Sequence, residues 1–237
     1  MNGGGIGKNM TSGYSAKHDI AKIQEAEMFY ASFLAYTESL FNDLIKTNQL
    51  DSNSIFERVR MVYESICYDR RYILRVQYLA DPKGYENYLI SHTVRTTIIA
   101  LIIGINMKLP VHRLLELGVS ALLHDIGMFS LPQNLYLDSR IFTDQEKKLL
   151  RTHPVQGYKC LTQNNFPLSV KEGVIEHHER ENGSGYPRNL KGVNISLYGK
   201  IITVACSYEA ISAKRLHKES KDYHTGIMEL VDRKSVV

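Results

Sequence analysis

The chain has 237 residues, of which 43% are hydrophobic and 23% charged, values typical of a globular protein that can bury a core. Its net charge of +4 suits a phosphate-bearing ligand but falls short of the basic surface of a DNA- or RNA-binding protein. Three cysteines, Cys67, Cys160 and Cys206, show no CxxC spacing, so we expect a reducing, cytoplasmic setting. The longest apolar run, 98–107, is too short to cross a bilayer, and we expect no membrane span.

The N-terminal third of the sequence predicts a tail and two long helices. Residues 1–15 are rich in glycine and serine, and we expect a flexible tail there. Apolar residues then recur at helical spacing over 16–46. Ser54 and Glu57 have the spacing of a capping box that would open a second helix, ending near residue 80 at a turn with proline and glycine. We assign residues 16–81 to an N-terminal helical segment, either the remnant of a sensory region that joins partner signalling domains or a hairpin that forms a homodimer.

The rest of the chain, residues 82–237, is assigned to a second helical domain. Apolar periodicity predicts helices over about 85–107, 111–127, 196–213 and 222–231. Two further capping boxes, Thr143 with Glu146 and Ser169 with Glu172, would open a helix that reaches His153 and a helix that delivers His177 and His178. Because no segment alternates like a strand, the predicted fold class is all-α.

Six side chains of metal-binding type recur in this second domain, 24 to 32 residues apart from one helix to the next. They are His92, His124, Asp125, His153, His177 and His178. Two neighbouring divalent ions can activate water and neutralise the charge that develops when a phosphodiester is hydrolysed, and binding them takes neutral imidazoles and a bridging carboxylate. Each of these residues alone could be a core, surface or helix-end residue; their conjunction favours a metal site.

Two motifs identify a family. Residues 176–187 read Glu-His-His-Glu-Arg-Glu-Asn-Gly-Ser-Gly-Tyr-Pro, and residues 121–127 end in His-Asp-Ile-Gly. With His92 and the His-Pro pair at 153, these motifs resemble the HD-GYP family, the cyclic-di-GMP phosphodiesterase branch of the HD-domain metallohydrolases. The resemblance covers roughly residues 85–230 and implies an HD-type helical bundle behind the N-terminal helical segment.

The resemblance also implies roles for individual residues. The six ligand-type residues would hold two divalent ions, iron or manganese, with Asp125 bridging them and with His124 and Asp125 at the catalytic centre. The substrate-binding residues that it implies are Gly185, Tyr186, Arg215 and Lys218. The implied reaction opens cyclic-di-GMP to the linear dinucleotide pGpG, with GMP as a further product to be tested.

The sequence departs from the family pattern where activity is concerned. Cys206 stands where the family has a metal-binding carboxylate, and a thiolate is a softer ligand; Cys206 could equally be a small buried hydrophobic side chain. Glu209, one turn later, is an alternative carboxylate ligand. Met128 replaces a lysine and removes a positive charge expected near the phosphate. These departures keep open a second interpretation, a catalytically weak or degenerate binding or interaction module. A third, a phosphohydrolase of other nucleotides, is disfavoured by the intact Gly-Tyr-Pro motif.

Overall fold

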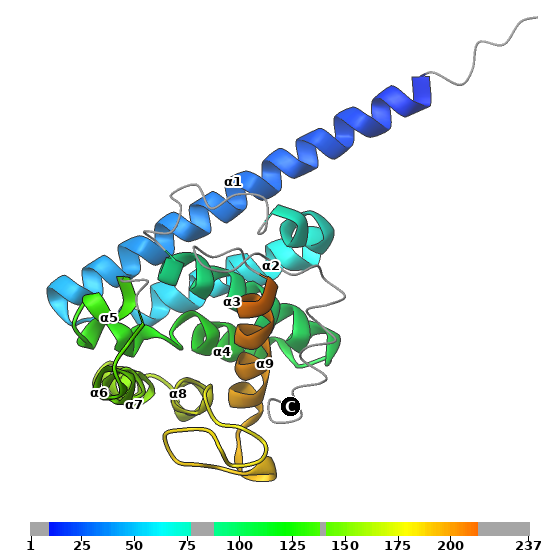
Figure 1. Ribbon diagram of the computed structural model, residues 1–237. Helices are drawn as coiled ribbons and strands as arrows, with labels where there is room; N and C mark the ends of the chain where they lie inside the picture. The colour runs from blue at the N-terminus through cyan, green and yellow to red at the C-terminus, as the bar shows by residue number, and fades with distance from the viewer. Residues whose placement is uncertain (1–9, 77–87, 138–140, 213–237) are drawn as a thin grey trace, which may run out of the picture.

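The computed structural model describes residues 10–76, 88–137 and 141–212, and within these ranges the chain is helical with no strand. The prediction of an all-α fold is confirmed. Two long N-terminal helices lie along one side of a group of shorter helices (Figure 1). Arg215, Lys218 and the helix expected over 222–231 lie outside the described residues, as does the expected boundary near residue 81.

The N-terminal helices are α1 (Met10–Thr47) and α2 (Ser52–Val76), which form a hairpin. Because α1 begins at Met10, the expectation of a flexible tail is wrong for residues 10–15. Once a helix is nucleated, each added residue gains a hydrogen bond, and a single glycine costs only about 1 kcal/mol. The buried side chains of both helices belong to the same apolar cluster as those of the helices beneath them, so the hairpin is packed onto the rest of the fold.

The start of α2 differs from the prediction. The side chain of Asp51 accepts hydrogen bonds from the backbone N–H groups of Asn53 and Ser54, at 3.0 and 3.2 Å. Asp51 therefore caps the helix and Ser54 lies inside it, so the capping box with Glu57 is wrong. The loop before α2 is tied to a distant helix as well, because the N–H of Leu50 donates to Oδ1 of Asn164 at 2.8 Å.

At the centre of the molecule lies α3 (Tyr88–Asn106), which packs against α4 (Val111–Leu122) and α9 (Leu197–Ser212). By length and composition α3 could cross a membrane, with a mean hydropathy of 1.6 over its most apolar window. However, 72% of that window is buried within the fold, which is typical of a core helix. The prediction of a helix over 196–213 is met by α9.

After α4 the chain forms a series of shorter helices joined by turns and loops. The helix expected over 111–127 ends at Leu122, and η2 (Ile126–Ser130) and α5 (Asn134–Leu137) follow it. Next come α6 (Asp144–Leu150), α7 (His153–Gln163), α8 (Leu168–Glu176) and η3 (Gly192–Asn194). His124 and Asp125 thus lie in a turn instead of in the last turn of a helix.

The capping predictions for α6 and α8 have opposite outcomes. Thr143 and Glu146 form the complete capping box of α6. Ser169 instead lies inside α8, where its hydroxyl donates to Oε2 of Glu116 at 2.9 Å, so the capping box with Glu172 is wrong. His153 begins a separate helix, α7, and does not end the one before it, so the prediction of one helix reaching His153 is wrong. Proline in the first turn, here Pro154, is a favoured helix start.

Candidate metal centre

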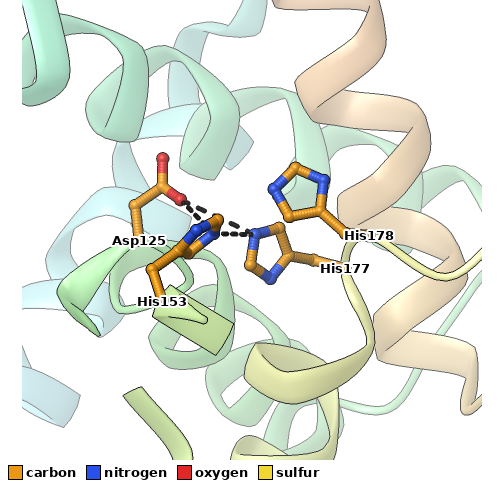
Figure 2. A group of neighbouring side chains, drawn as sticks. All are labelled: Asp125, His153, His177 and His178. Atoms are coloured by element: carbon orange, nitrogen blue, oxygen red, sulfur yellow. Dashed lines mark hydrogen bonds and ion pairs between the residues drawn. The ribbon is translucent and has the colours of Figure 1, made fainter. Parts of the chain in front are cut away.

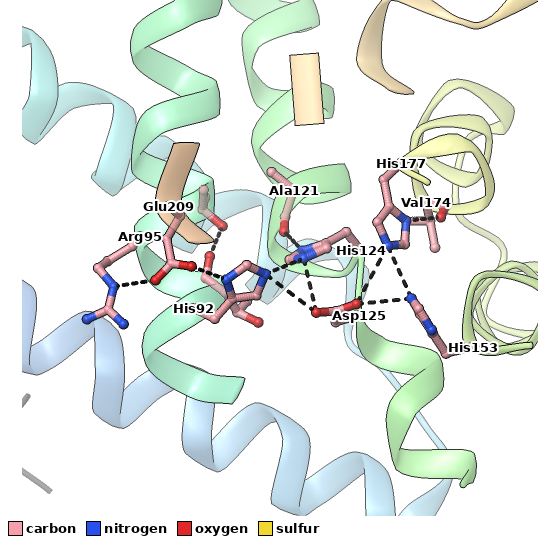
Figure 3. A network of polar contacts seen from close by, with 11 residues as sticks. His92, Arg95, Ala121, His124, Asp125, His153, Val174, His177 and Glu209 are labelled. Carbon is pink, nitrogen blue, oxygen red and sulfur yellow. Dashed lines mark hydrogen bonds and ion pairs between the residues drawn. The ribbon is translucent and has the colours of Figure 1, made fainter. Parts of the chain in front are cut away.

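The six predicted ligand residues come together at one place, where several helices begin or end (Figure 2 and Figure 3). His124 and Asp125 follow α4, His153 is the first residue of α7, and His177 and His178 follow the last residue of α8. His92 reaches the same place from the side of α3. Backbone segments separated by more than 80 residues thus meet around one carboxylate.

A close approach of two backbone segments brings Asp125 to His153. A Cβ atom on Gly127 would lie 2.0 Å from the carbonyl oxygen of His153 and 2.5 Å from the backbone nitrogen of Gly157. Only glycine fits at this contact between η2 and the start of α7. The glycine of the His-Asp-Ile-Gly motif therefore positions the carboxylate that precedes it.

The carboxylate of Asp125 faces two groups of histidines, one with each oxygen. Its Oδ1 lies 3.2 Å from Nε2 of His153 and 3.6 Å from Nε2 of His177. Its Oδ2 lies 3.2 Å from Nε2 of His124 and 3.7 Å from Nε2 of His92. This is the arrangement expected of a carboxylate shared by two ions.

The histidine rings are held with Nε2 pointing at the centre. The Nδ1–H groups of His124, His153 and His177 donate to the backbone carbonyl three residues earlier, at 2.7, 2.7 and 2.6 Å. His92 uses its Nδ1 as well, in a hydrogen bond to the carboxylate of Glu209. Partners of this kind fix the tautomer and the orientation of metal-binding histidines.

The inward nitrogens fit a cation. Nε2 of His92 lies 3.3 Å from Nε2 of His124, and Nε2 of His153 lies 3.2 Å from Nε2 of His177. Because Nδ1 of each of these rings is used in a hydrogen bond that points outward, Nε2 of each ring is left to face the centre. Two nitrogens bound to one ion at about 2.0–2.1 Å lie roughly 3 Å apart. The donor set and its spacing therefore suit metal ions.

The ligand atoms form two groups, each with its atoms within 4.8 Å of one another. One group consists of Asp125, His153, His177 and His178, whose side chains converge in Figure 2. The other consists of His92, His124 and Cys206. Asp125 lies between the groups, since its Oδ2 faces the two histidines of the second one.

Glu209 lies behind His92 and not among the inward-facing atoms. This carboxylate is fully buried, and its Oε1 accepts a hydrogen bond from Nε of Arg95 at 2.9 Å while its Oε2 accepts from Nδ1 of His92. Burial acts to lower the pKa of His92, but the charge of Glu209 and its hydrogen bond contribute to raising that pKa to about 9. Glu209 thus faces away from the inward nitrogens, whereas Cys206, one turn earlier on α9, lies with His92 and His124.

Charges within the centre shift the pKa values of its members. Burial acts to raise the pKa of Asp125, yet the charge of His124 and hydrogen bonds from three histidines hold it well below its usual range. Burial lowers the pKa of His177 to about 4 and that of His178 well below its ordinary value. Both rings are thus neutral at neutral pH, as metal binding requires. Burial acts to raise the pKa of Cys206, but the charge of His124 and hydrogen bonds with His124 and His92 lower it to about 6.

The loop after the histidine pair folds back on that pair. Glu179 is buried and accepts hydrogen bonds from the N–H groups of Arg188 and Leu190 at 2.7 and 2.9 Å. A Cβ atom on Gly185 would lie 2.4 Å from the backbone nitrogen of Arg180. The ring of Tyr186 stacks on that of His178, with centroids 4.6 Å apart. The Gly-Tyr-Pro motif therefore supports a ligand residue.

A cavity of about 290 Å³ opens onto the centre. Five of the six predicted ligand residues line it, all except His153, together with Tyr88, Arg180, Ser207 and Ala210, among others. Neither Gly185 nor Tyr186 is among the described residues that line it. Arg180 was not predicted as a site residue from the sequence, although its position directly after the His-His-Glu motif indicates a cation near the centre.

Met128 does not face this cavity either. Its side chain is buried in a small apolar cluster with Leu131 and Leu135. The expectation that Met128 leaves a gap in the charge around the phosphate is therefore not supported by its surroundings, since it occupies an apolar position.

The fold and the site together define an α-helical protein with a histidine and aspartate centre suited to metal ions. The chain belongs to the HD domain family, whose model matches residues 84–235, and the resemblance to the HD-GYP branch is confirmed by the relatives that follow. It is 32% identical over 156 residues to "Cyclic di-GMP phosphodiesterase PdeB" of Borreliella burgdorferi, covering 66% of this chain and 41% of that protein.

A second relative and a solved structure agree. The chain is 31% identical to a "Cyclic di-GMP phosphodiesterase" of Thermotoga maritima, over 71% of this chain and 45% of that protein. It therefore spans less than half the length of both relatives. The structure named "Bd1817, a HDG"Y"P protein from Bdellovibrio bacteriovorus" shares the fold, with a TM-score of 0.67 and 15% identity over 98% of this chain and 77% of that one.

Proposed function

We propose that this chain is a metal-dependent phosphodiesterase that hydrolyses cyclic-di-GMP to the linear dinucleotide, with GMP as a further product to be tested. The observation that carries the proposal is the position of Asp125, whose two oxygens face two separate groups of histidines. The names of the relatives support the substrate. No observation favours the degenerate module.

The ligand residues would hold two divalent ions, for which iron and manganese are our proposal. His153, His177 and His178 would bind one ion and His92 and His124 the other, with Asp125 shared between them. Ions in such a pair supply activation of water and neutralisation of the charge on the phosphate. Glu209 acts as a positioning residue, because its carboxylate holds the ring of His92 through Nδ1.

The other residues of the cavity would bind and orient the substrate. Arg180 lines the cavity together with the ligand residues, so its guanidinium is placed to bind a phosphate oxygen, an interaction that charge makes strong. Arg215 and Lys218 remain proposed phosphate-binding residues outside the described part of the chain. Gly185 and Tyr186 act on the substrate only indirectly, through the position of Arg180 and His178.

The setting of the protein is also a proposal. Cys67, Cys160 and Cys206 are all free thiols, which supports a cytoplasmic location. Met28 on α1 and Tyr68 on α2 are exposed, with 73% and 76% of their surface accessible. These side chains support a contact surface on the N-terminal helices, for either a homodimer or partner signalling domains.

The test is hydrolysis of cyclic-di-GMP by protein loaded with manganese or iron, with products separated by chromatography. We expect the linear dinucleotide from the wild type and none above background from the double variant His124→Ala with Asp125→Ala. Protein that holds its metals and binds cyclic-di-GMP without cleaving it would overturn the proposal in favour of the degenerate module.

A further inference from the structure

We propose that Cys206 is a thiolate ligand of the ion held by His92, His124 and Asp125, so that the two halves of the centre prefer different metals. The inference rests on the metal centre of the proposed function but not on its catalytic activity. It concerns the one ligand position at which this chain departs from the carboxylate of the HD-GYP pattern.

The position of the sulfur carries the inference. The Sγ of Cys206 and one ring nitrogen each of His92 and His124 lie within 4.8 Å of one another. The Nε2 atoms of these two histidines lie 3.3 Å apart and face Oδ2 of Asp125 at 3.7 and 3.2 Å. The sulfur of Cys206 and Oδ2 of Asp125 thus both lie close to the same pair of histidines.

The helix that carries Cys206 is fixed against the centre on both sides of it. One turn earlier, the hydroxyl of Thr203 donates to the backbone carbonyl of His177 at 2.7 Å. One turn later, Glu209 accepts from Nδ1 of His92. Residues three apart share one face of a helix, so the face of α9 that includes Cys206 is directed at the centre.

The count of donors favours a ligand over an inert side chain. Without Cys206, the second half offers His92, His124 and one oxygen of Asp125, which is three donors. The thiolate would supply the fourth, and four donors of nitrogen, oxygen and sulfur type match the tetrahedral sites that zinc prefers. Cys206 also lines the cavity beside both histidines, which an inert core residue would not need to do.

The two halves would then differ in chemistry. Asp125, His153, His177 and His178 offer nitrogen and oxygen donors, which suit iron(II) or manganese(II). The half with Cys206 adds a soft sulfur donor, which selects zinc and other thiophilic ions. We therefore expect unequal occupancy, with a thiophilic ion at the Cys206 half.

Cobalt(II) added to metal-free protein reports the sulfur ligand directly. A cobalt ion bound by a thiolate gives an intense sulfur-to-metal charge-transfer band in the near ultraviolet, and one bound by nitrogen and oxygen alone does not. We expect the band in the wild type, its loss in Cys206→Ser, and its retention in Cys160→Ser, a control at a half-buried cysteine of α7. Zinc should bind Cys206→Ser at least about tenfold more weakly, because even partners outside the coordination shell contribute 10–100-fold to affinity.

Cys206→Asp separates this inference from the proposed function. This variant should bind two manganese ions, and when loaded with cobalt instead it should give no charge-transfer band. A wild type that hydrolyses cyclic-di-GMP but gives no band with cobalt, or a band that persists in Cys206→Ser, would overturn the inference and leave the function standing. A band that depends on Cys206 in a protein without hydrolytic activity would support the inference while the proposed function fails.

Discussion

Glu209 binds His92 through the ring nitrogen that faces away from the centre. The carboxylate is fully buried between Arg95 and His92, and it fixes the orientation of the imidazole through Nδ1. The ligand and the residue that orients it come from α3 and α9, 117 positions apart. Any change that weakens this pair should loosen one half of the centre without removing a ligand.

Glu209→Gln tests this relationship. The amide keeps the shape of the side chain but loses the charge that holds both Arg95 and His92. We expect metal affinity to fall about 10- to 100-fold with two ions still bound at saturation, measured by titration calorimetry, and Glu27→Gln on the exposed face of α1 to behave as wild type. A maximum of one ion in Glu209→Gln would identify Glu209 as a direct ligand.

Gly127→Ala tests the contact between η2 and α7. The added Cβ would overlap the backbone of His153 and Gly157, so Asp125 and His153 must move apart. Overpacking of this kind costs about 1–3 kcal/mol of folding free energy, measurable by urea denaturation. We expect a loss of metal affinity as well, and an alanine variant with unchanged affinity would refute the role assigned to Gly127.

Met128→Lys tests whether the missing lysine matters. The apolar cluster around Met128 offers an ammonium group no partner of opposite charge among its members, so we expect a loss of about 2 kcal/mol or more in stability and no gain in turnover. Met128→Leu conserves volume and should cost less than about 1.5 kcal/mol. A rise in cyclic-di-GMP affinity in Met128→Lys would show that position 128 reaches the substrate.

The helices and their ligands were predictable from the sequence because both depend on local patterns. Apolar spacing identified α1, α3 and α9, and the spacing of the histidines and of Asp125 singled out six side chains that the structure brings together. The helix-start predictions that were wrong required a choice between two neighbouring residues that could each cap the helix. Asp51 and Ser54 are both good caps, and only the geometry shows that Asp51 is used.

Contacts between distant segments could not be predicted in the same way. The burial of Glu209 against His92 and Arg95 depends on how α9 packs on α3, which no local pattern encodes. We expected Gly185 to lie close to the substrate, but in the structure it lies close to the backbone of Arg180. The position of Arg180 in the lining of the cavity likewise depends on the tertiary structure.

Arg180→Gln tests the cation in the cavity. A hydrogen bond to a charged group contributes about 1.5–3 kcal/mol, so we expect KM for cyclic-di-GMP to rise roughly 10- to 100-fold while metal content is unchanged. Lys159→Gln, an exposed change on α7, removes the same charge and should have no effect. Equal KM values in the two variants would remove Arg180 from the proposed substrate site.

The central claim is that one carboxylate, Asp125, is shared by two metal ions, and the number of ions bound per chain tests it most directly. We expect titration calorimetry of metal-free protein with cobalt(II), which binds nitrogen, oxygen and sulfur donors, to give two equivalents for the wild type, and Asp125→Ala to bind fewer than two at the same concentrations. A wild type that saturates at one equivalent, or an Asp125→Ala variant that still binds two with unchanged affinity, would contradict the account.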